Sequence, residues 1–188
     1  MHNRPETVYV SFSAQIAPQT TEVLIGQLSQ FVNEGIPKVH LLISTPGGSV
    51  MDGLNIYNVL KGMPIELTTH NVGNVDSIGN AIFQAGDRRF ACPRSTFMFH
   101  GVGFDIDGRH RLEEKTLRER LDSLNADQRR VGAIIEEHSN LSGPEIERLF
   151  LEQTTKDAAA ALDAGLIDEI CDVSIPENGP MVSLVFNR

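Results

Sequence analysis

A serine, a histidine and a pair of glycines each follow a strand-like segment in the middle of the chain. The glycines lie in residues 45–49 (TPGGS), Ser77 lies in residues 73–79 (GNVDSIG), and His100 ends residues 97–100 (FMFH). Since parallel strands deliver their ends to one edge of a sheet, a nucleophile, a base and an anion-stabilising turn can converge there. The spacing therefore predicts acyl-transfer chemistry of the serine peptidase kind.

Each of these residues also has a structural interpretation when it is taken alone. Ser77 opens a predicted helix, where a serine commonly caps free N–H groups, although the same N–H groups favour a developing negative charge. Gly47 and Gly48 suit an ordinary tight turn, and a lone histidine such as His100 is more often structural than catalytic. Val75 excludes the Gly-x-Ser-x-Gly elbow of α/β-hydrolases, which needs glycine two residues before the serine.

Strand-like and helix-like segments alternate through the first half of the chain. Short β-branched or apolar runs bounded by turn residues predict strands, and apolar residues at helical spacing predict helices. This alternation indicates an α/β fold built from βαβ-type units. The predicted strands are 7–13, 39–43, 65–72, 89–92 and 96–99, and the predicted helices are 18–33, 50–62 and 78–85.

The segment 109–138 is dense in charge and predicts a long helix with a narrow apolar seam. One interpretation packs the seam on the protein's own core and leaves the charges in solvent, and the other projects the helix against a second subunit. A capping-box pattern at 142–145 and an alanine-rich run at 157–164 predict two further helices, and 181–186 is a final strand or a tail. The seam residues are Leu117, Leu121, Leu124, Val131 and Ile135.

Length and composition limit the classes of protein to which the chain can belong. The 188 residues fit one domain, 1–188. A net charge of -9 argues against a nucleic-acid partner. No apolar window approaches the roughly 20 residues that cross a bilayer, and the first residues lack the apolar core of a signal peptide. We therefore expect a cytoplasmic protein with no membrane partner.

The sequence predicts neither a metal nor another cofactor. The six histidines show no H-x-x-x-H or H-E-x-x-H pattern. Cys92 and Cys171 stand alone, without C-x-x-C spacing. We expect both to be small buried apolar residues rather than a disulfide or metal ligands.

Taken together, the motifs resemble the proteolytic subunit family of the Clp ATP-dependent protease (ClpP-like). Residues 44–48 (STPGG) look like the family's Asn-Ser-Pro-Gly-Gly turn, and 73–79 look like the start of its nucleophile helix. Residues 96–100 (TFMFH) look like the strand that bears its histidine, and 164–168 (AGLID) resemble its Tyr-Gly-Leu-Ile-Asp. The resemblance runs from about Val8 to Ile170.

This resemblance implies roles for four residues. Ser77 is expected to be the nucleophile and His100 its general base, while the N–H groups of Gly48 and Ile78 form the oxyanion hole. It also implies a ClpP/crotonase-like ββα spiral with a projecting long helix at about 109–138. The implied function is peptide-bond hydrolysis without a cofactor, inside a homo-oligomeric ring (a heptamer or stacked heptamers).

Three features depart from the family pattern. Asp76 precedes the serine where the family has a small residue, so its carboxylate is expected to raise the histidine pKa, obstruct a substrate carbonyl or point to solvent. Gln153 stands where the acid that orients the histidine is expected, with Glu152 beside it and Asp157 four residues on. The segment before the first strand, where the family docks its ATPase, is short, which puts an unfoldase partner in doubt.

Two alternatives remain open at this level. A non-catalytic ClpP-like ring subunit agrees with Asp76 and the missing acid, and predicts that Ser77→Ala changes no activity. A crotonase-like acyl-CoA hydratase or isomerase keeps the fold, and turnover of a CoA thioester would distinguish it.

Overall fold

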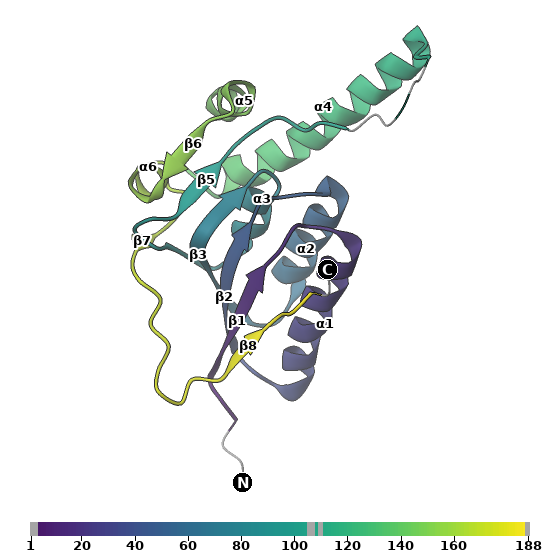
Figure 1. Ribbon diagram of the computed structural model, residues 1–188. Helices are drawn as coiled ribbons and strands as arrows, with labels where there is room; N and C mark the ends of the chain where they lie inside the picture. The colour runs from purple at the N-terminus through teal and green to yellow at the C-terminus, as the bar shows by residue number, and fades with distance from the viewer. Residues whose placement is uncertain (1–3, 105–107, 109–110, 187–188) are drawn as a thin grey trace.

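A computed structural model describes residues 4–104, 108 and 111–186 (Figure 1). The strands are β1 (Thr7–Ser13), β2 (Lys38–Thr45), β3 (Glu66–Asp76), β4 (Arg88–Ala91), β5 (Thr96–Met98), β6 (Thr155–Asp157), β7 (Glu169–Ile170) and β8 (Met181–Ser183). The helices are α1 (Pro18–Glu34), α2 (Val50–Gly62), α3 (Gly79–Phe83), α4 (Glu114–Glu137), α5 (Gly143–Glu152) and α6 (Ala158–Asp163).

The described strands form an eight-stranded sheet at the centre of the fold. One path through it runs β6-β5-β3-β2-β1-β8, and β4 and β7 branch from β3. Strands β1, β2 and β3 are parallel, so each pair needs a crossover, which α1 and α2 supply. Strand β8 pairs with β1, so residues 181–183 form a strand rather than a tail. The α/β class predicted from the sequence is confirmed.

Strand β3 is the branch point of the sheet. Its first half, Thr68–Asn71, pairs with β4, and its last residues, Asn74–Asp76, pair with β5. The strand therefore runs four residues beyond the predicted end at Val72 and reaches the residue before Ser77. As a result, β5 lies beside the very end of β3, which places the segment after β5 close to the turn after β3.

Helix α3 is shorter than predicted and wholly buried. It spans five residues, Gly79–Phe83, where the sequence indicated a helix over 78–85. Gly86 follows in a crowded position, where a Cβ would lie 2.4 Å from Thr69 Oγ1. This packing brings the chain directly back into β4.

Helix α4 packs on the protein's own core in one half and leaves the body of the fold in the other. Its C-terminal half contributes Val131 and Ile135 to the core, while Leu117 and Leu121 are 47% and 56% exposed. The N-terminal half projects away from the sheet (Figure 1). The helix begins at Glu114, later than the predicted 109, because residues 111–113 are not helical and residues 109–110 lie outside the described part.

An aromatic row crosses one face of the sheet, with one side chain on each of four neighbouring strands. Tyr9 stacks on His40 with ring centroids 5.1 Å apart, and His40 stacks on His70 at 5.4 Å. Phe90 meets His70 edge-on at 5.8 Å. His40 Nε2 lies 3.1 Å from His70 Nδ1, and His70 Nε2 lies 3.0 Å from the carbonyl oxygen of Cys171. Since a carbonyl only accepts, His70 carries its proton on Nε2, and His40 donates to His70 Nδ1.

The two histidines favour the neutral form. Burial, and then the neighbouring His70, lowers the pKa of His40 to about 4 from its ordinary value of 6.5. Burial also lowers the pKa of His70. The unfolded chain therefore binds more protons than the folded protein between about pH 6.5 and pH 4, so stability is complete above pH 6.5 and declines as pH falls through that window.

We expect His40→Gln to flatten this decline. Glutamine keeps a donor for His70 Nδ1 but does not titrate, so the variant should lose about 1–3 kcal/mol less than wild type between pH 6.5 and pH 4. Urea unfolding at intervals across this range measures the difference. If the free energy of unfolding falls equally with pH in the two proteins, His40 does not contribute to the loss of stability in acid.

Candidate active site

Ser77 occupies a strained turn between β3 and α3. Its φ of 57° lies in the left-handed region, which non-glycine residues seldom adopt. Its backbone N–H donates to the carbonyl oxygen of Met98 at 2.8 Å. The side chain is partly exposed. A serine held in this way is presented at the end of the sheet instead of being folded into the helix, and such strain is typical of functional sites.

The Pro-Gly-Gly turn lies directly against Ser77. A Cβ at Gly47 would come within 2.7 Å of Ser77 Cβ and 3.4 Å of Ser77 Oγ. At Gly48, where φ is 146°, a Cβ would lie 2.1 Å from the carbonyl oxygen of Ile16. Only glycine fits both places without displacing the chain. The structure thus brings together the predicted turn and the predicted nucleophile.

Two backbone N–H groups beside Ser77 are free. Within the described residues, the N–H groups of Gly48 and Ile78 donate no hydrogen bond to the protein. Gly48 is exposed, whereas the side chain of Ile78 is buried against Gly53. Free backbone donors close in the structure to a serine suit a ligand that carries negative charge on oxygen.

His100 lies just beyond β5, two residues after the Met98 carbonyl that binds Ser77. Its strand continues alongside the end of α5, because Phe99 N–H donates to the carbonyl of Thr154 at 2.8 Å and Gly101 N–H to that of Phe150 at 3.1 Å. His100 Nδ1 lies 2.8 Å from the carbonyl oxygen of Gly101. Among the described residues, no hydrogen bond joins Ser77 Oγ to the imidazole.

The carbonyl contact fixes the tautomer of the neutral imidazole. Because a carbonyl oxygen accepts and never donates, His100 Nδ1 carries the proton and Nε2 carries the free lone pair. A general base needs its lone pair on the outward nitrogen, so His100 is prepared for that task.

Asn80 holds the two parts of the site together, and the sequence analysis missed it. The side chain is 1% exposed. Its Nδ2 donates to the carbonyl oxygens of Met98 at 2.8 Å and Ser77 at 3.1 Å. The signal that was available is a single asparagine in an otherwise apolar buried run, because a buried amide must find hydrogen-bond partners.

The carboxylate of Asp76 is bound on the strand rather than at the histidine. Asn74 Nδ2 donates to it at 2.6 Å and also to the carbonyl of Thr45 at 3.2 Å, while Ser44 Oγ lies 3.1 Å from Asn74 Oδ1. In the described part of the chain, Asp76 forms no ion pair with His100. This hydrogen bond from Asn74 was not among the outcomes expected for Asp76.

Among the described residues, no hydrogen bond or ion pair joins a carboxylate to His100. Asp157 lies opposite Thr96 in the β5–β6 pair, and its Oδ1 caps α6 by accepting from Ala160 N–H at 2.8 Å. Glu152 is exposed at the end of α5. The pairing of β5 with β6 ends at Met98 and Thr155, and Gln153 is the C-terminal cap of α5, in the left-handed conformation at φ 52°.

A cleft of about 490 Å³ opens beside the free N–H of Gly48. It runs between the Pro-Gly-Gly turn, the segment after His100 and the projecting half of α4. The guanidinium of Arg120 lies over the ring of Phe104, 4.8 Å from its centroid. The lining residues are Gln15, Gly48, Ser49, Val50, Met51, Val102, Gly103, Phe104, Arg120, Ser123, Leu124 and Asp127.

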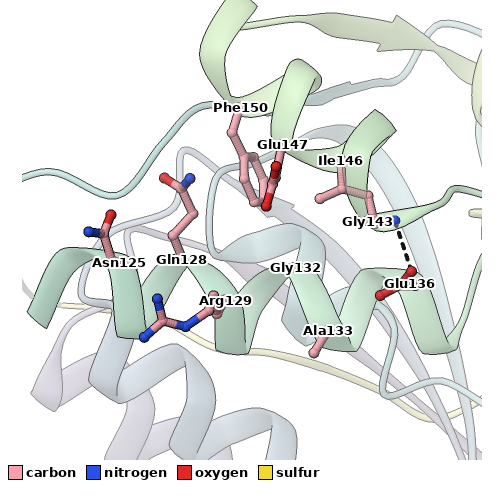
Figure 2. A pocket seen from close by; sticks show the side chains of 10 residues that line it. All are labelled: Asn125, Gln128, Arg129, Gly132, Ala133, Glu136, Gly143, Ile146, Glu147 and Phe150. Atoms are coloured by element: carbon pink, nitrogen blue, oxygen red, sulfur yellow. Dashed lines mark hydrogen bonds between the residues drawn. The ribbon is translucent and has the colours of Figure 1, made fainter. Parts of the chain in front are cut away.

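A second pocket, of about 270 Å³, lies between α4 and α5, and neither Ser77 nor His100 lines it (Figure 2). Ile146 and Phe150 of α5 face α4 there, and Gly143 N–H donates to Glu136 Oε1 at 2.8 Å (Figure 2). The pocket lacks a nucleophile–base pair. Ser77 and His100 do not line the cleft beside Gly48 either, but Gly48 does, so we assign the candidate site to the turn at Gly48 and the cleft that opens from it.

The residues that the structure describes also bear on metal binding and on membrane insertion. No group of three histidine, cysteine, aspartate or glutamate side chains there is arranged to hold a metal ion. No helix in that part is both long and apolar enough to cross a membrane.

Comparison with protein families gives a match over most of the chain. The model of the Clp protease family matches residues 5–174 of the 188. The matched range contains the glycine turn, Ser77, His100, the projecting helix and the strands β1 to β7. The chain belongs to the Clp protease family.

Proposed function

We propose that this protein is a serine peptidase in which Ser77 is the nucleophile and His100 is the general base. The observation that carries the proposal is the junction at Met98. Its carbonyl accepts from the N–H of Ser77, so a strained serine is fixed beside the strand that ends in a histidine with a free Nε2. Family membership supports peptide bonds, rather than CoA thioesters, as the substrate.

The proposed reaction has two steps. In the first, Ser77 Oγ attacks the scissile carbonyl carbon, His100 Nε2 takes the hydroxyl proton and then gives it to the leaving amine. In the second, water attacks the acyl-enzyme, Nε2 takes a proton from that water, and the carboxylic acid leaves as the proton returns to Ser77 Oγ.

The oxyanion formed in each step needs donors that are already in place. The free N–H groups of Gly48 and Ile78 flank Ser77 and are the donors that we assign to this task. One such donor is typically worth about 10²–10³ in rate. Because both belong to the backbone, they stay aligned without an ordering cost in the transition state.

The carbonyl of Gly101 replaces the usual carboxylate in one of its two tasks. It holds the correct tautomer of His100, as an aspartate would. It carries no full charge, so it stabilises the imidazolium less than a carboxylate. We therefore expect an active but slow peptidase.

We also propose that the protein acts as a homo-oligomeric ring in which α4 contacts another subunit. Leu117 and Leu121 are large apolar side chains on the half of the helix that leaves the body of the fold (Figure 1). Exposed leucines one helical turn apart are typical of a helix-packing seam. Membership of the Clp protease family supports this assembly.

A non-catalytic ring subunit is the second candidate. The absence of a carboxylate beside His100 among the described residues, together with Asp76 next to the nucleophile, favours it. The two candidates differ in whether Ser77 reacts, and a serine-directed reagent measures this directly.

We expect a fluorophosphonate to form one covalent adduct with the wild-type protein and none with Ser77→Ala. His100→Asn should slow labelling by about 10²–10⁴-fold because the base is lost. Labelling is measured from pH 6 to pH 9. Intact-mass spectrometry counts the adducts. Folded, oligomeric protein that stays unlabelled at every pH would support the non-catalytic ring subunit.

We expect Gln153→Ala to change the labelling rate by less than about tenfold, because the Gly101 carbonyl holds the Nδ1 proton. Gln153→Asp should increase the rate if residue 153 is the position of the acid, because a carboxylate there stabilises the imidazolium. Stopped-time labelling of the three proteins gives the comparison. A loss of about 10³-fold in Gln153→Ala would instead make Gln153 the residue that positions His100.

We expect Leu121→Asp to break the assembly into smaller species while leaving the fold intact, because it places a charge in the proposed apolar seam. Leu151→Asp is the matched control, since Leu151 on α5 is 85% exposed and lies outside the seam. Sedimentation velocity measures the size of each species, and circular dichroism monitors the fold. Wild-type sedimentation of Leu121→Asp would rule out this seam.

A further inference from the structure

The two cysteines occupy neighbouring positions at the end of the β4–β7 branch. Phe90 pairs with Glu169 and Ala91 with Ile170, in parallel register. The ladder continues, because Cys171 N–H donates to the carbonyl of Ala91 at 3.0 Å. The next pair in this register is Cys92 and Cys171. Both are free thiols and half-buried, so the prediction of two fully buried apolar residues is wrong.

The residue after Cys92 decides how the ladder ends. The next rung of a parallel pair requires an N–H from residue 93, and Pro93 has none. The carbonyl of Cys171 instead accepts from His70 Nε2 at 3.0 Å, and Cys92 Sγ lies 3.6 Å from the same nitrogen. The imidazole therefore contacts both cysteine residues at once.

This geometry suits a bond between the two sulfur atoms. Residues paired in register on neighbouring strands point to the same face, with backbones about 4.8 Å apart. Disulfides join Cα atoms about 4.4–6.8 Å apart, so the backbone needs little movement. A metal site is a poorer fit, because His70 Nε2 already donates to a carbonyl and is not free to bind a cation.

We propose that Cys92 and Cys171 form a reversible disulfide, with a small-molecule disulfide such as oxidised glutathione as the oxidant. One protein thiolate attacks the small disulfide, forming a mixed disulfide and releasing one reduced thiol. The other protein thiolate then attacks the protein sulfur of that mixed disulfide and releases the second. Two protein thiols are oxidised, and one small disulfide is reduced to two thiols.

The bond ties the end of β4 to the start of the segment 172–180, which has no regular structure and leads to β8. It would close a long stretch of chain that contains β5, β6 and the helices α4, α5 and α6. A cross-link over so long a loop restricts the unfolded chain. The modification is independent of whether Ser77 is a nucleophile.

Thiol–disulfide exchange at Cys92 and Cys171 should be slow near neutral pH. Burial raises the pKa of the Cys92 thiol and of the Cys171 thiol. Since the thiolate is the attacking species, the rate of oxidation should increase as the pH rises from 7 to 9.

Oxidised and reduced glutathione at set ratios, followed by alkylation and intact-mass spectrometry of the whole protein, tests the proposal. At a high ratio of oxidised to reduced glutathione, the wild-type protein should lose two hydrogens and take up no alkyl group. Dithiothreitol should return it to the dithiol. Its Tm should be about 5–10 °C above that of the reduced protein.

Cys92→Ser and Cys171→Ser are the matched controls. Each should carry one glutathione or one alkyl group, with no change in Tm between the two redox conditions. Two alkyl groups on wild type at every ratio, two retained glutathiones, or a disulfide-linked dimer on a non-reducing gel would each overturn the proposal.

Discussion

The carbonyl oxygen of Met98 is the point on which the candidate site depends. It accepts hydrogen bonds from Ser77 N–H at 2.8 Å and from the buried Asn80 Nδ2 at 2.8 Å. One acceptor thereby fixes the end of β3, the start of α3 and the approach to His100. Buried hydrogen bonds of this kind are expensive to leave unmade, so the three segments keep one arrangement.

Close approach of backbone to backbone is the second constraint. The glycine turn contacts Ser77 on one side and Ile16 on the other, at distances that leave no room for a Cβ. The same packing leaves the N–H groups of Gly48 and Ile78 without protein acceptors in the described residues. The strain at Ser77, with φ at 57°, is held by this surrounding structure. The Pro-Gly-Gly turn therefore accounts both for the close backbone contacts and for the unpaired N–H groups.

The branch at β3 explains why a single sheet presents two unlike features. The β5–β6 branch leads to His100 and ends against α5, while the β4–β7 branch carries Phe90 of the aromatic row and leads to the two cysteines. His70 lies on β3 opposite Phe90 and links His40 to the Cys171 carbonyl. The chemistry proposed for Ser77 and the redox chemistry proposed for Cys92 thus use separate parts of the sheet.

The sequence by itself determined the α/β class and most of the strands and helices, and it nominated Ser77, His100, Gly48 and Ile78 as a site that stays a prediction. These rest on local signals, since periodicity, turn glycines and motif spacing are properties of neighbouring residues. Element ends were less well predicted: β3 runs on to Asp76 because β5 pairs with it there, and α3 stops early because the chain turns into β4.

Only the tertiary structure decided which side chains meet. It showed that Asp157 caps α6 and that a backbone carbonyl fixes the tautomer of His100. It also placed Asn80 behind Ser77, and Cys92 beside Cys171. The physical reason is that these contacts depend on the path of the sheet between residues far apart in the chain, and no local pattern of residue types records that path.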